Sequence, residues 1–298
     1  MPRNTLTFKD IFPRVFIGCI WIAITCVMLW DCSKDIMDEK YQNRGIIFTA
    51  IYLFVSIIWL WAYYSACWSD PGSIEAFYKK LGVYDDILNG NTPEILTLLP
   101  VCQKCHLPKP ERTHHCSRCG LCYFKFDHHC PVIGNCVAFN NFKGFFFMPI
   151  YGTILLIILG VELGMHHGWV LIIIPCPFAF LFLLFSLSYC SQICDNLTTL
   201  EKETLKCEPP FQQSKCQNFT EVFDGFFGLF LPTPPKISGF HWSGEQIENG
   251  VYELQKMMKS KDRKKESTKN STRSSKISNQ KDPSDHDQSS SKDLDSEP

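Results

Sequence analysis

Four long apolar runs set the main limit on how this chain can fold. They cover residues 11–30, 46–68, 145–164 and 169–193. Their only charged side chains are Arg14 and Glu162. A helix needs about 20 mainly apolar residues to cross the hydrocarbon core of a bilayer, whereas a surface helix of a soluble protein carries a polar stripe. The sequence therefore predicts an all-α membrane protein with four transmembrane helices.

A cleaved signal peptide is the alternative interpretation of the first run. Such a peptide ends at a small-residue cleavage site. This run has no convincing site of that kind, and the loop after it is charged rather than rich in alanine. We interpret the first run as a retained membrane helix.

Lysine and arginine are unevenly divided between the two sides of the predicted bundle. The segment between the second and third runs contains eight of them, namely Lys79, Lys80, Lys104, Lys109, Arg112, Arg118, Lys125 and Lys143. The loop on the opposite side has only Lys34, Lys40 and Arg44. Because cytoplasmic loops carry the excess of these residues, we expect both termini and this segment to face the cytosol.

Cysteine and histidine cluster in the same cytosolic segment. Seven of the 16 cysteines lie between Cys102 and Cys136, together with five histidines. The cytosol keeps thiols reduced, and Cys-x-x-Cys pairs with nearby histidine and cysteine are typical of tetrahedral structural zinc. We therefore expect bound metal rather than disulfides. Two closed sites use eight ligands, so some of these side chains are left over.

Cys130 is the candidate for a reactive thiol among the remaining side chains, because Asp127 and His128 lie just before it. The thiolate is the nucleophilic form of cysteine, and an adjacent histidine lowers the pKa of a thiol. An aspartate can hold such a histidine in the required tautomer. The spacing alone leaves open which histidine activates the thiol and which binds metal.

Residues 102–136 closely resemble the cysteine-rich domain of the DHHC protein S-acyltransferases, also called palmitoyltransferases. Three further segments are similar to motifs of that family: Asp-Pro-Gly at 70–72, Thr-Thr-Leu-Glu at 198–201 and an asparagine-containing segment at 218–223. The resemblance covers roughly residues 11–230. It implies a four-helix membrane bundle with a small cytosolic zinc-binding domain between helices 2 and 3.

The resemblance also implies a role for each residue of the cysteine-rich motif. The expected ligands are Cys102, Cys105, His115 and Cys122 for one zinc ion, and Cys116, Cys119, His129 and Cys136 for the other. The catalytic group is expected to be Asp127, His128 and Cys130. Both zinc ions are expected to be structural.

The implied activity is transfer of a palmitoyl or other long-chain acyl group from acyl-CoA to cysteines of cytosolic or membrane proteins, through an acyl-Cys130 intermediate. Basic side chains bind phosphate well, so we expect Lys109 and Arg112 to contact the CoA phosphates. Members of the family are expected in Golgi or endoplasmic reticulum membranes. The net charge of −1 gives no reason to expect a nucleic-acid partner.

Two positions depart from the family pattern. Residues 132–134, Val-Ile-Gly, stand where the family often has a stretch containing tryptophan. Asp224 stands where the family usually has glycine. The first departure bears on the lining of the pocket and the second on local geometry, and neither affects a metal ligand or the catalytic residues.

The chain divides into five predicted segments. They are a stub with transmembrane helices 1 and 2 (1–68), a cytosolic loop with the cysteine-rich domain (69–143, core 100–137), transmembrane helices 3 and 4 (144–195), a cytosolic C-terminal segment (196–258) and a tail (259–298). The tail consists mostly of Ser, Lys, Asp, Asn and Gln. Such a composition cannot bury enough apolar surface to offset chain entropy, so we expect the tail to be disordered.

Three other functions fit the pattern less well. A membrane-anchored zinc module that binds partners, such as a RING-like ubiquitin ligase, would space its ligands differently and gives no reason for a free Cys130. A transporter or channel would place polar residues within its helices, and only Glu162 qualifies. A catalytically silent member of the family is the third alternative, but here the trio from Asp127 to Cys130 is intact.

Overall fold

The computed structural model describes residues 7–204, 211 and 213–260 of the chain. The chain separates into two compact units, 1–251 and 252–298; in the second unit residues 252–260 are described, and they are helical. Every element discussed below belongs to the first unit. The tail predicted to be disordered lies outside the described residues, apart from its first two positions. The division into five segments stays a prediction.

Four helical segments in the described part of the chain are long and apolar enough to span a membrane. They are α1 (Phe8–Met37), α2 (Gln42–Trp68), α6 (Phe142–His167) and Trp169–Cys194, in which the 3-10 turn η1 (Trp169–Ile173) leads into α7 (Pro175–Cys194). Each segment contains one of the predicted apolar runs. The predicted all-α membrane fold is therefore confirmed, with the Cys/His segment between the second and third of these helices.

Helix α1 runs well past the end of the predicted apolar run. Its added turns contain Asp31 and Asp35, both buried. Lys34 lies 2.9 Å from Asp31, and Arg44 lies 2.5 Å from Asp35. Because these cations offset the carboxylate charges, the polar sequence after the apolar run remains helical.

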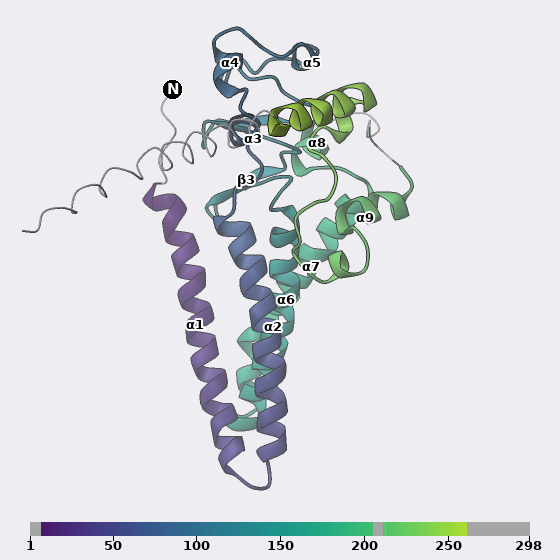
Figure 1. Cartoon of the computed structure of the whole chain (residues 1–298). Helices are drawn as coiled ribbons and strands as arrows, with labels where there is room; N and C mark the ends of the chain where they lie inside the picture. Colours follow the sequence, from purple (N-terminus) through teal and green to yellow (C-terminus); the bar gives the residue numbers. More distant parts are fainter. Residues whose placement is uncertain (1–6, 205–210, 212, 261–298) are drawn as a thin grey trace, which may run out of the picture. The chain divides into compact units, whose positions relative to one another are not determined.

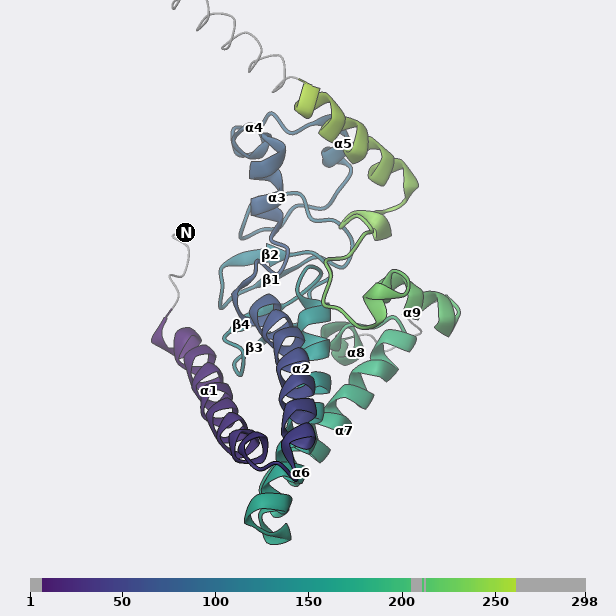
Figure 2. The same cartoon turned by 60° about the horizontal axis from the view of Figure 1, so that its bottom comes forward.

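Helix α6 is the centre of the bundle, since it packs against both α2 and α7. Figure 1 and Figure 2 show α2 and α6 side by side in both views. Small residues let membrane helices approach closely, and a Cβ added to Gly144 would lie only 2.6 Å from the Cβ of Ser65 in α2. The start of α6 is therefore held close to the end of α2.

Short helices and two β-hairpins lie between α2 and α6. The helices are α3 (Ile74–Leu81), α4 (Tyr84–Leu88) and α5 (Glu94–Thr97). The antiparallel hairpins are β1 (His114–Cys116) with β2 (Leu121–Tyr123), and β3 (His128–Cys130) with β4 (Asn135–Val137). We refer to residues 102–137, which contain both hairpins, as the Cys/His module.

Two asparagines attach the Cys/His module to the end of α2. Asn135 Nδ2 donates to the backbone carbonyls of Ala66 and Ser69, both at 3.1 Å. Asn141, directly before α6, donates to the same Ala66 carbonyl at 3.1 Å. Carbonyls in the last turn of a helix have no intrahelical partner. These bonds therefore cap α2 and fix the module against it.

The Asp-Pro-Gly segment makes the turn that follows α2. Asp70 Oδ1 accepts hydrogen bonds from the backbone N–H groups of Gly72 and Ser73, both at 2.9 Å. Gly72 has a φ of +104°, a conformation that glycine adopts without steric cost. The motif thus forms the turn that leads the chain from α2 into the segment between α2 and α6.

Helix α1 reaches the second hairpin of the Cys/His module. The Arg14 guanidinium donates to the carbonyl of Gly134, in the turn between β3 and β4. Gly134 has a φ of +60°, and a Cβ at this position would overlap the Asp10 carbonyl. The turn therefore requires glycine here, within the segment 132–134 that departs from the family pattern.

Several short elements follow α7 in the first unit, and residues 245–251 of this unit are also helical. The short elements are α8 (Thr199–Thr204), α9 (Lys215–Phe223), η2 (Phe227–Leu229) and η3 (His241–Ser243). Asn218 is buried, and its Nδ2 donates to the Cys194 carbonyl at the end of α7 at 2.7 Å. Asp224 ends α9 with a φ of +44°, a left-handed conformation that aspartate tolerates. Its carboxylate lies 3.1 Å from Lys143 Nζ, so the departure from glycine adds an ion pair.

Candidate active site and metal centres

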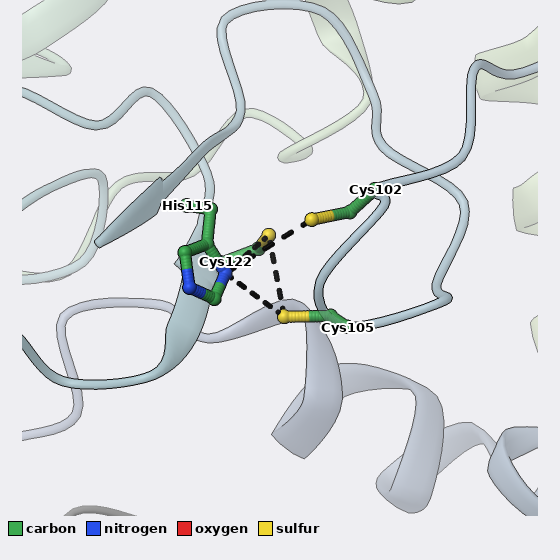
Figure 3. Close-up of side chains that lie close together, drawn as sticks. All are labelled: Cys102, Cys105, His115 and Cys122. Atoms are coloured by element: carbon green, nitrogen blue, oxygen red, sulfur yellow. Dashed lines mark hydrogen bonds between the residues drawn. The ribbon is translucent and has the colours of Figure 1, made fainter. Parts of the chain in front are cut away.

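Four predicted ligands meet at the first hairpin (Figure 3). Cys102 and Cys105 precede β1, whereas His115 and Cys122 face each other across β1 and β2. His115 Nδ1 lies 3.9, 3.1 and 3.7 Å from the sulfur atoms of Cys102, Cys105 and Cys122. The sulfur atoms of Cys105 and Cys122 are 3.6 Å apart. The four side chains thus converge on one point.

The second hairpin repeats this arrangement. Cys116 and Cys119 lie at the end of β1 and in the turn after it, and His129 faces Cys136 across β3 and β4. His129 Nδ1 lies 3.8, 3.3 and 3.5 Å from the sulfur atoms of Cys116, Cys119 and Cys136. The sulfur atoms of Cys119 and Cys136 are 3.4 Å apart.

Both groups fit a tetrahedral metal ion. Bond lengths of about 2.3 Å for Zn–S and about 2.0 Å for Zn–N place the ligand atoms about 3.5–3.8 Å apart. The separations from histidine nitrogen to cysteine sulfur span 3.1–3.9 Å, and all ligand atoms of a group lie within 4.8 Å of one another. The structure therefore brings the eight predicted ligands together in two sets that can each hold a metal ion.

A constant offset relates the two ligand sets in the sequence. The first set, Cys102, Cys105, His115 and Cys122, is followed 14 residues later by the second, Cys116, Cys119, His129 and Cys136. Each set therefore combines a Cys-x-x-Cys pair with a His/Cys pair across a hairpin. This offset is a signal in the sequence that assigns the ligands to their sets without reference to any family.

The same offset accounts for the free thiol. One further step of 14 residues leads from Cys116 to Cys130, but the corresponding step from Cys119 leads to Ile133. Residues 130–133 therefore contain the first cysteine of a further Cys-x-x-Cys pair but not the second. Cys130 belongs to none of the metal-ligand groups found among the described residues.

The alternation of side chains along β3 places the predicted metal ligand and the candidate reactive thiol on different faces. Successive side chains of a strand point to opposite faces, so His129 lies on one face and His128 and Cys130 on the other. Cys130 is 7% exposed and joins an apolar cluster that includes Cys67 of α2 and Phe145 of α6. The face of β3 that carries Cys130 therefore packs on the ends of the membrane helices.

Asp127 orients His128 and is itself held by the chain at and after the end of α7. Its Oδ2 lies 2.7 Å from His128 Nδ1. Thr199 donates its backbone N–H to Oδ1 at 2.6 Å and its hydroxyl to Oδ2 at 2.9 Å, and the Tyr189 hydroxyl donates to Oδ2 at 3.4 Å. With Nδ1 engaged by Asp127, the other ring nitrogen is the one available to the thiol of Cys130.

The surroundings of His128 and Cys130 favour an ion pair between them. Burial opposes the charged form of His128, but hydrogen bonds to Asp127 and Cys130 outweigh burial and raise the pKa of His128 to about 9. Burial likewise raises the pKa of Cys130, but the hydrogen bond to His128 and backbone N–H groups of Ile133 and Val132 lower this pKa below its usual value. A thiolate beside an imidazolium is the reactive state of a catalytic cysteine.

Arg112, one of the two residues expected to contact CoA phosphates, lies in a buried internal ion pair. Its Nε and Nη2 lie 2.7 and 2.6 Å from the carboxylate oxygens of Glu201. It also donates to the side-chain and backbone oxygens of Asn196, both at 2.9 Å. These bonds join the Cys/His module to the segment after α7. The phosphate contacts of Lys109 and Arg112 stay predictions.

Replacing Glu201 by alanine should destabilise the protein by about 3–5 kcal/mol, because the buried Arg112 guanidinium loses its paired carboxylate. Glu203→Ala is the matched control, since Glu203 is exposed on the same short helix, and it should change stability by less than about 0.5 kcal/mol. Thermal unfolding of the purified proteins in one detergent measures both effects. Equal melting temperatures for the two variants would contradict a stabilising role for the ion pair.

The sequence around the Cys/His module is similar to those of known proteins. Residues 97–168 match a family model described as DHHC palmitoyltransferase. Palmitoyltransferase ZDHHC20 of Homo sapiens is 28% identical over 161 residues, which are 45% of this chain and 44% of that protein. Probable protein S-acyltransferase 12 of Arabidopsis thaliana is 31% identical over 142 residues, 47% of this chain and 48% of that protein. Probable protein S-acyltransferase 13 of the same plant is 27% identical over 249 residues, 70% of this chain and 79% of that protein.

The family match includes both metal-ligand sets and the residues from Asp127 to Cys130. The chain spans less than half the length of the first two relatives and most of the third. This chain is therefore related to the DHHC palmitoyltransferases and carries their family domain in residues 97–168.

Proposed function

We propose that this protein is an enzyme, a protein S-acyltransferase that moves a palmitoyl or similar long-chain acyl group from acyl-CoA to cysteines of other proteins. One observation carries the proposal. Cys130 lies outside both metal-ligand sets and contacts His128, which Asp127 holds at 2.7 Å. A cysteine thiolate activated by histidine is suited to accept an acyl group and pass it on.

In the first step the Cys130 thiolate attacks the carbonyl carbon of the acyl-CoA thioester. A bond forms between this carbon and Cys130 Sγ, and the bond from the carbon to the CoA sulfur breaks. The departing CoA thiolate takes the proton of the His128 imidazolium. The products are free CoA, acyl-Cys130 and a neutral His128, with Asp127 still bonded to Nδ1 of the ring.

In the second step a cysteine of the substrate protein replaces CoA. His128 takes the proton of the substrate thiol, and the resulting thiolate attacks the acyl carbon. The bond from this carbon to Cys130 Sγ breaks, which restores the thiolate–imidazolium pair. Each half of the reaction exchanges one thioester for another, so the enzyme needs no external source of energy.

The surroundings of Cys130 suit a long-chain donor. Cys130 packs in one apolar cluster with side chains of α2 and α6. An acyl chain that stays among membrane helices avoids returning its methylenes to water at about 0.8 kcal/mol each. We therefore infer that the acyl chain lies along these helices while the CoA head group stays at the Cys/His module.

Zinc is the metal that the two ligand sets suit best. Three thiols and one imidazole complete a tetrahedral shell, so no coordination position remains for a substrate. The chemistry that bound zinc supplies is thus structural, a link between the strands of each hairpin. Through β3, this link would hold Cys130 and His128 at the ends of the membrane helices.

The distribution of lysine and arginine supports an orientation with both termini and the Cys/His module in the cytosol. Substrates would then be cytosolic or membrane proteins that present a cysteine near the bilayer surface. Golgi or endoplasmic reticulum membranes are the proposed location of the enzyme. No feature of the sequence or site calls for a nucleic acid as partner.

Purified full-length protein incubated with labelled palmitoyl-CoA tests the proposal directly. We expect about one acyl group per chain, released by neutral hydroxylamine and mapped by mass spectrometry to the peptide that contains Cys130. Addition of a membrane-bound peptide with one cysteine should then move the label from enzyme to peptide. A folded, metal-loaded protein that forms no hydroxylamine-sensitive acyl-enzyme would not be an S-acyltransferase.

A further inference from the structure

The third membrane helix contains an acidic residue that the proposed acyl transfer does not use. Glu162 is 1% exposed and lies in α6 near the end away from the Cys/His module. A buried carboxylate is costly unless it is paired or coordinates a metal ion, and within a membrane helix it marks a functional position. Glu162 therefore requires a partner.

Two other side chains converge on Glu162. His166 lies one turn later on α6, and its Nε2 is 3.4 Å from Glu162 Oε2. The same nitrogen is 3.4 Å from Oδ1 of Asp35, which is buried in α1. The three ligand atoms lie within 4.8 Å of one another. Asp35 lies near the end of α1 and His166 in the last turn of α6. The loop that joins the end of α1 to α2 is at the bottom of Figure 1.

Lone pairs in this cluster are left without hydrogen bonds. Glu162 Oε2 and His166 Nε2 are buried, and neither forms a hydrogen bond with any residue in the described part of the chain. The 3.4 Å between these two atoms is an ion pair only with a protonated His166; with a neutral imidazole, both atoms can bind a common cation. Unpaired buried acceptors beside a second carboxylate are what a bound cation would satisfy.

The charges around the cluster also favour a cation. Arg44 pairs with both oxygens of Asp35, at 2.5 and 2.8 Å. With a neutral His166, the carboxylates of Asp35 and Glu162 together with this one guanidinium leave a net negative charge. Helices α1 and α6 both end here, and the carbonyl end of a helix dipole attracts positive charge. A carboxylate has about four lone-pair positions, so Asp35 can accept from Arg44 and still bind an ion.

We propose that Asp35, Glu162 and His166 bind a divalent transition-metal ion, with Zn²⁺ as the best candidate. One imidazole and two carboxylates suit first-row ions such as zinc better than calcium or magnesium, which prefer oxygen ligands alone. The sulfur of Cys32 lies 3.7 Å from Glu162 Oε1 and is the nearest further donor. The bound ion ties the end of α1 to the end of α6, on the opposite side of the bilayer from the Cys/His module.

Metal content of the purified full-length protein tests this site. Wild-type protein and the variants Glu162→Gln and His166→Gln are equilibrated with the same low concentration of Zn²⁺, freed of loosely bound ions and measured by mass spectrometry of the metal. We expect each variant to hold about one ion per chain less than wild type. The ligand sets of the Cys/His module are untouched, so their ions cancel in this difference.

His167→Gln provides the matched control. His167 is the neighbour of His166 but bonds to Asp31 at 2.9 Å and lies outside the cluster. This variant should keep the wild-type metal content. Glu162→Gln changes charge with almost no change in shape, so it decides the question if His166→Gln does not fold. Equal metal content in wild type, Glu162→Gln and His167→Gln would overturn the proposal.

Discussion

Cys130→Ser protein should form no hydroxylamine-sensitive acyl-enzyme, and its rate of acyl transfer should fall by at least about 10³-fold. Serine is close to cysteine in size, but its hydroxyl does not ionise near neutral pH, so the thiolate–imidazolium pair with His128 is lost. Asp127 and the two metal-ligand sets are unchanged, so the fold is retained. Single-turnover labelling with palmitoyl-CoA measures the loss.

Cys194→Ser is the control for this experiment. Cys194 is a half-buried cysteine at the end of α7 and belongs to none of the metal-ligand groups among the described residues. The Cys194→Ser protein should take up the acyl label at the wild-type rate, because neither Asp127 nor His128 contacts the thiol of Cys194. Normal labelling of Cys130→Ser would show that another thiol accepts the acyl group and would remove the basis of the proposed mechanism.

The membrane helices could be predicted from sequence because the signal is local. Length and the lack of charge in each apolar run are sufficient, and each run lies in one observed helix. The end of α1 could not be predicted in this way. Asp31 and Asp35 suggest a loop until their partners are known, and one partner, Arg44, comes from the next helix.

In the candidate site, too, the local patterns could be predicted from sequence and the contacts between distant residues could not. The 14-residue offset and the Asp-His-His-Cys motif are local patterns, and they contain the metal-ligand sets and the residues around Cys130. The groups that hold Asp127 are distant in sequence: Tyr189 is 62 residues away and Thr199 is 72 residues away. A tyrosine in an apolar run gives no sign that it contacts a carboxylate of the Cys/His module.

The internal ion pair of Arg112 illustrates a second limit. The charge of an arginine predicts contacts with anions, but it does not show whether a carboxylate of the same chain is one of them. Glu201, which provides that partner, is 89 residues further along the chain. Glu201 belongs to the Thr-Thr-Leu-Glu motif, but its pairing with Arg112 is visible only in the structure.

Cys116→Ser should unfold the Cys/His module and abolish acyl-enzyme formation, although Cys130 remains in place. A structural zinc ion contributes about 10–16 kcal/mol to the folding of small zinc domains, which is comparable to the whole stability of a typical domain, about 5–15 kcal/mol. The short strands of the module, three residues each, cannot replace that contribution. Removal of the metal from wild-type protein with a chelator should have the same effect.

Cys116→Ser and Cys130→Ser form a matched pair, because the same substitution is made at equivalent positions of two hairpins, 14 residues apart. We expect the first variant to lose bound zinc and to be cleaved by trypsin within residues 100–137, under conditions where wild type and Cys130→Ser stay intact. Both variants lack acyl transfer, so activity does not distinguish them. A difference in bound zinc and in trypsin cleavage is expected only if the metal has a structural role. Wild-type resistance to trypsin in Cys116→Ser would mean that contacts such as Asn135 and Asn141 with α2 hold the module without zinc.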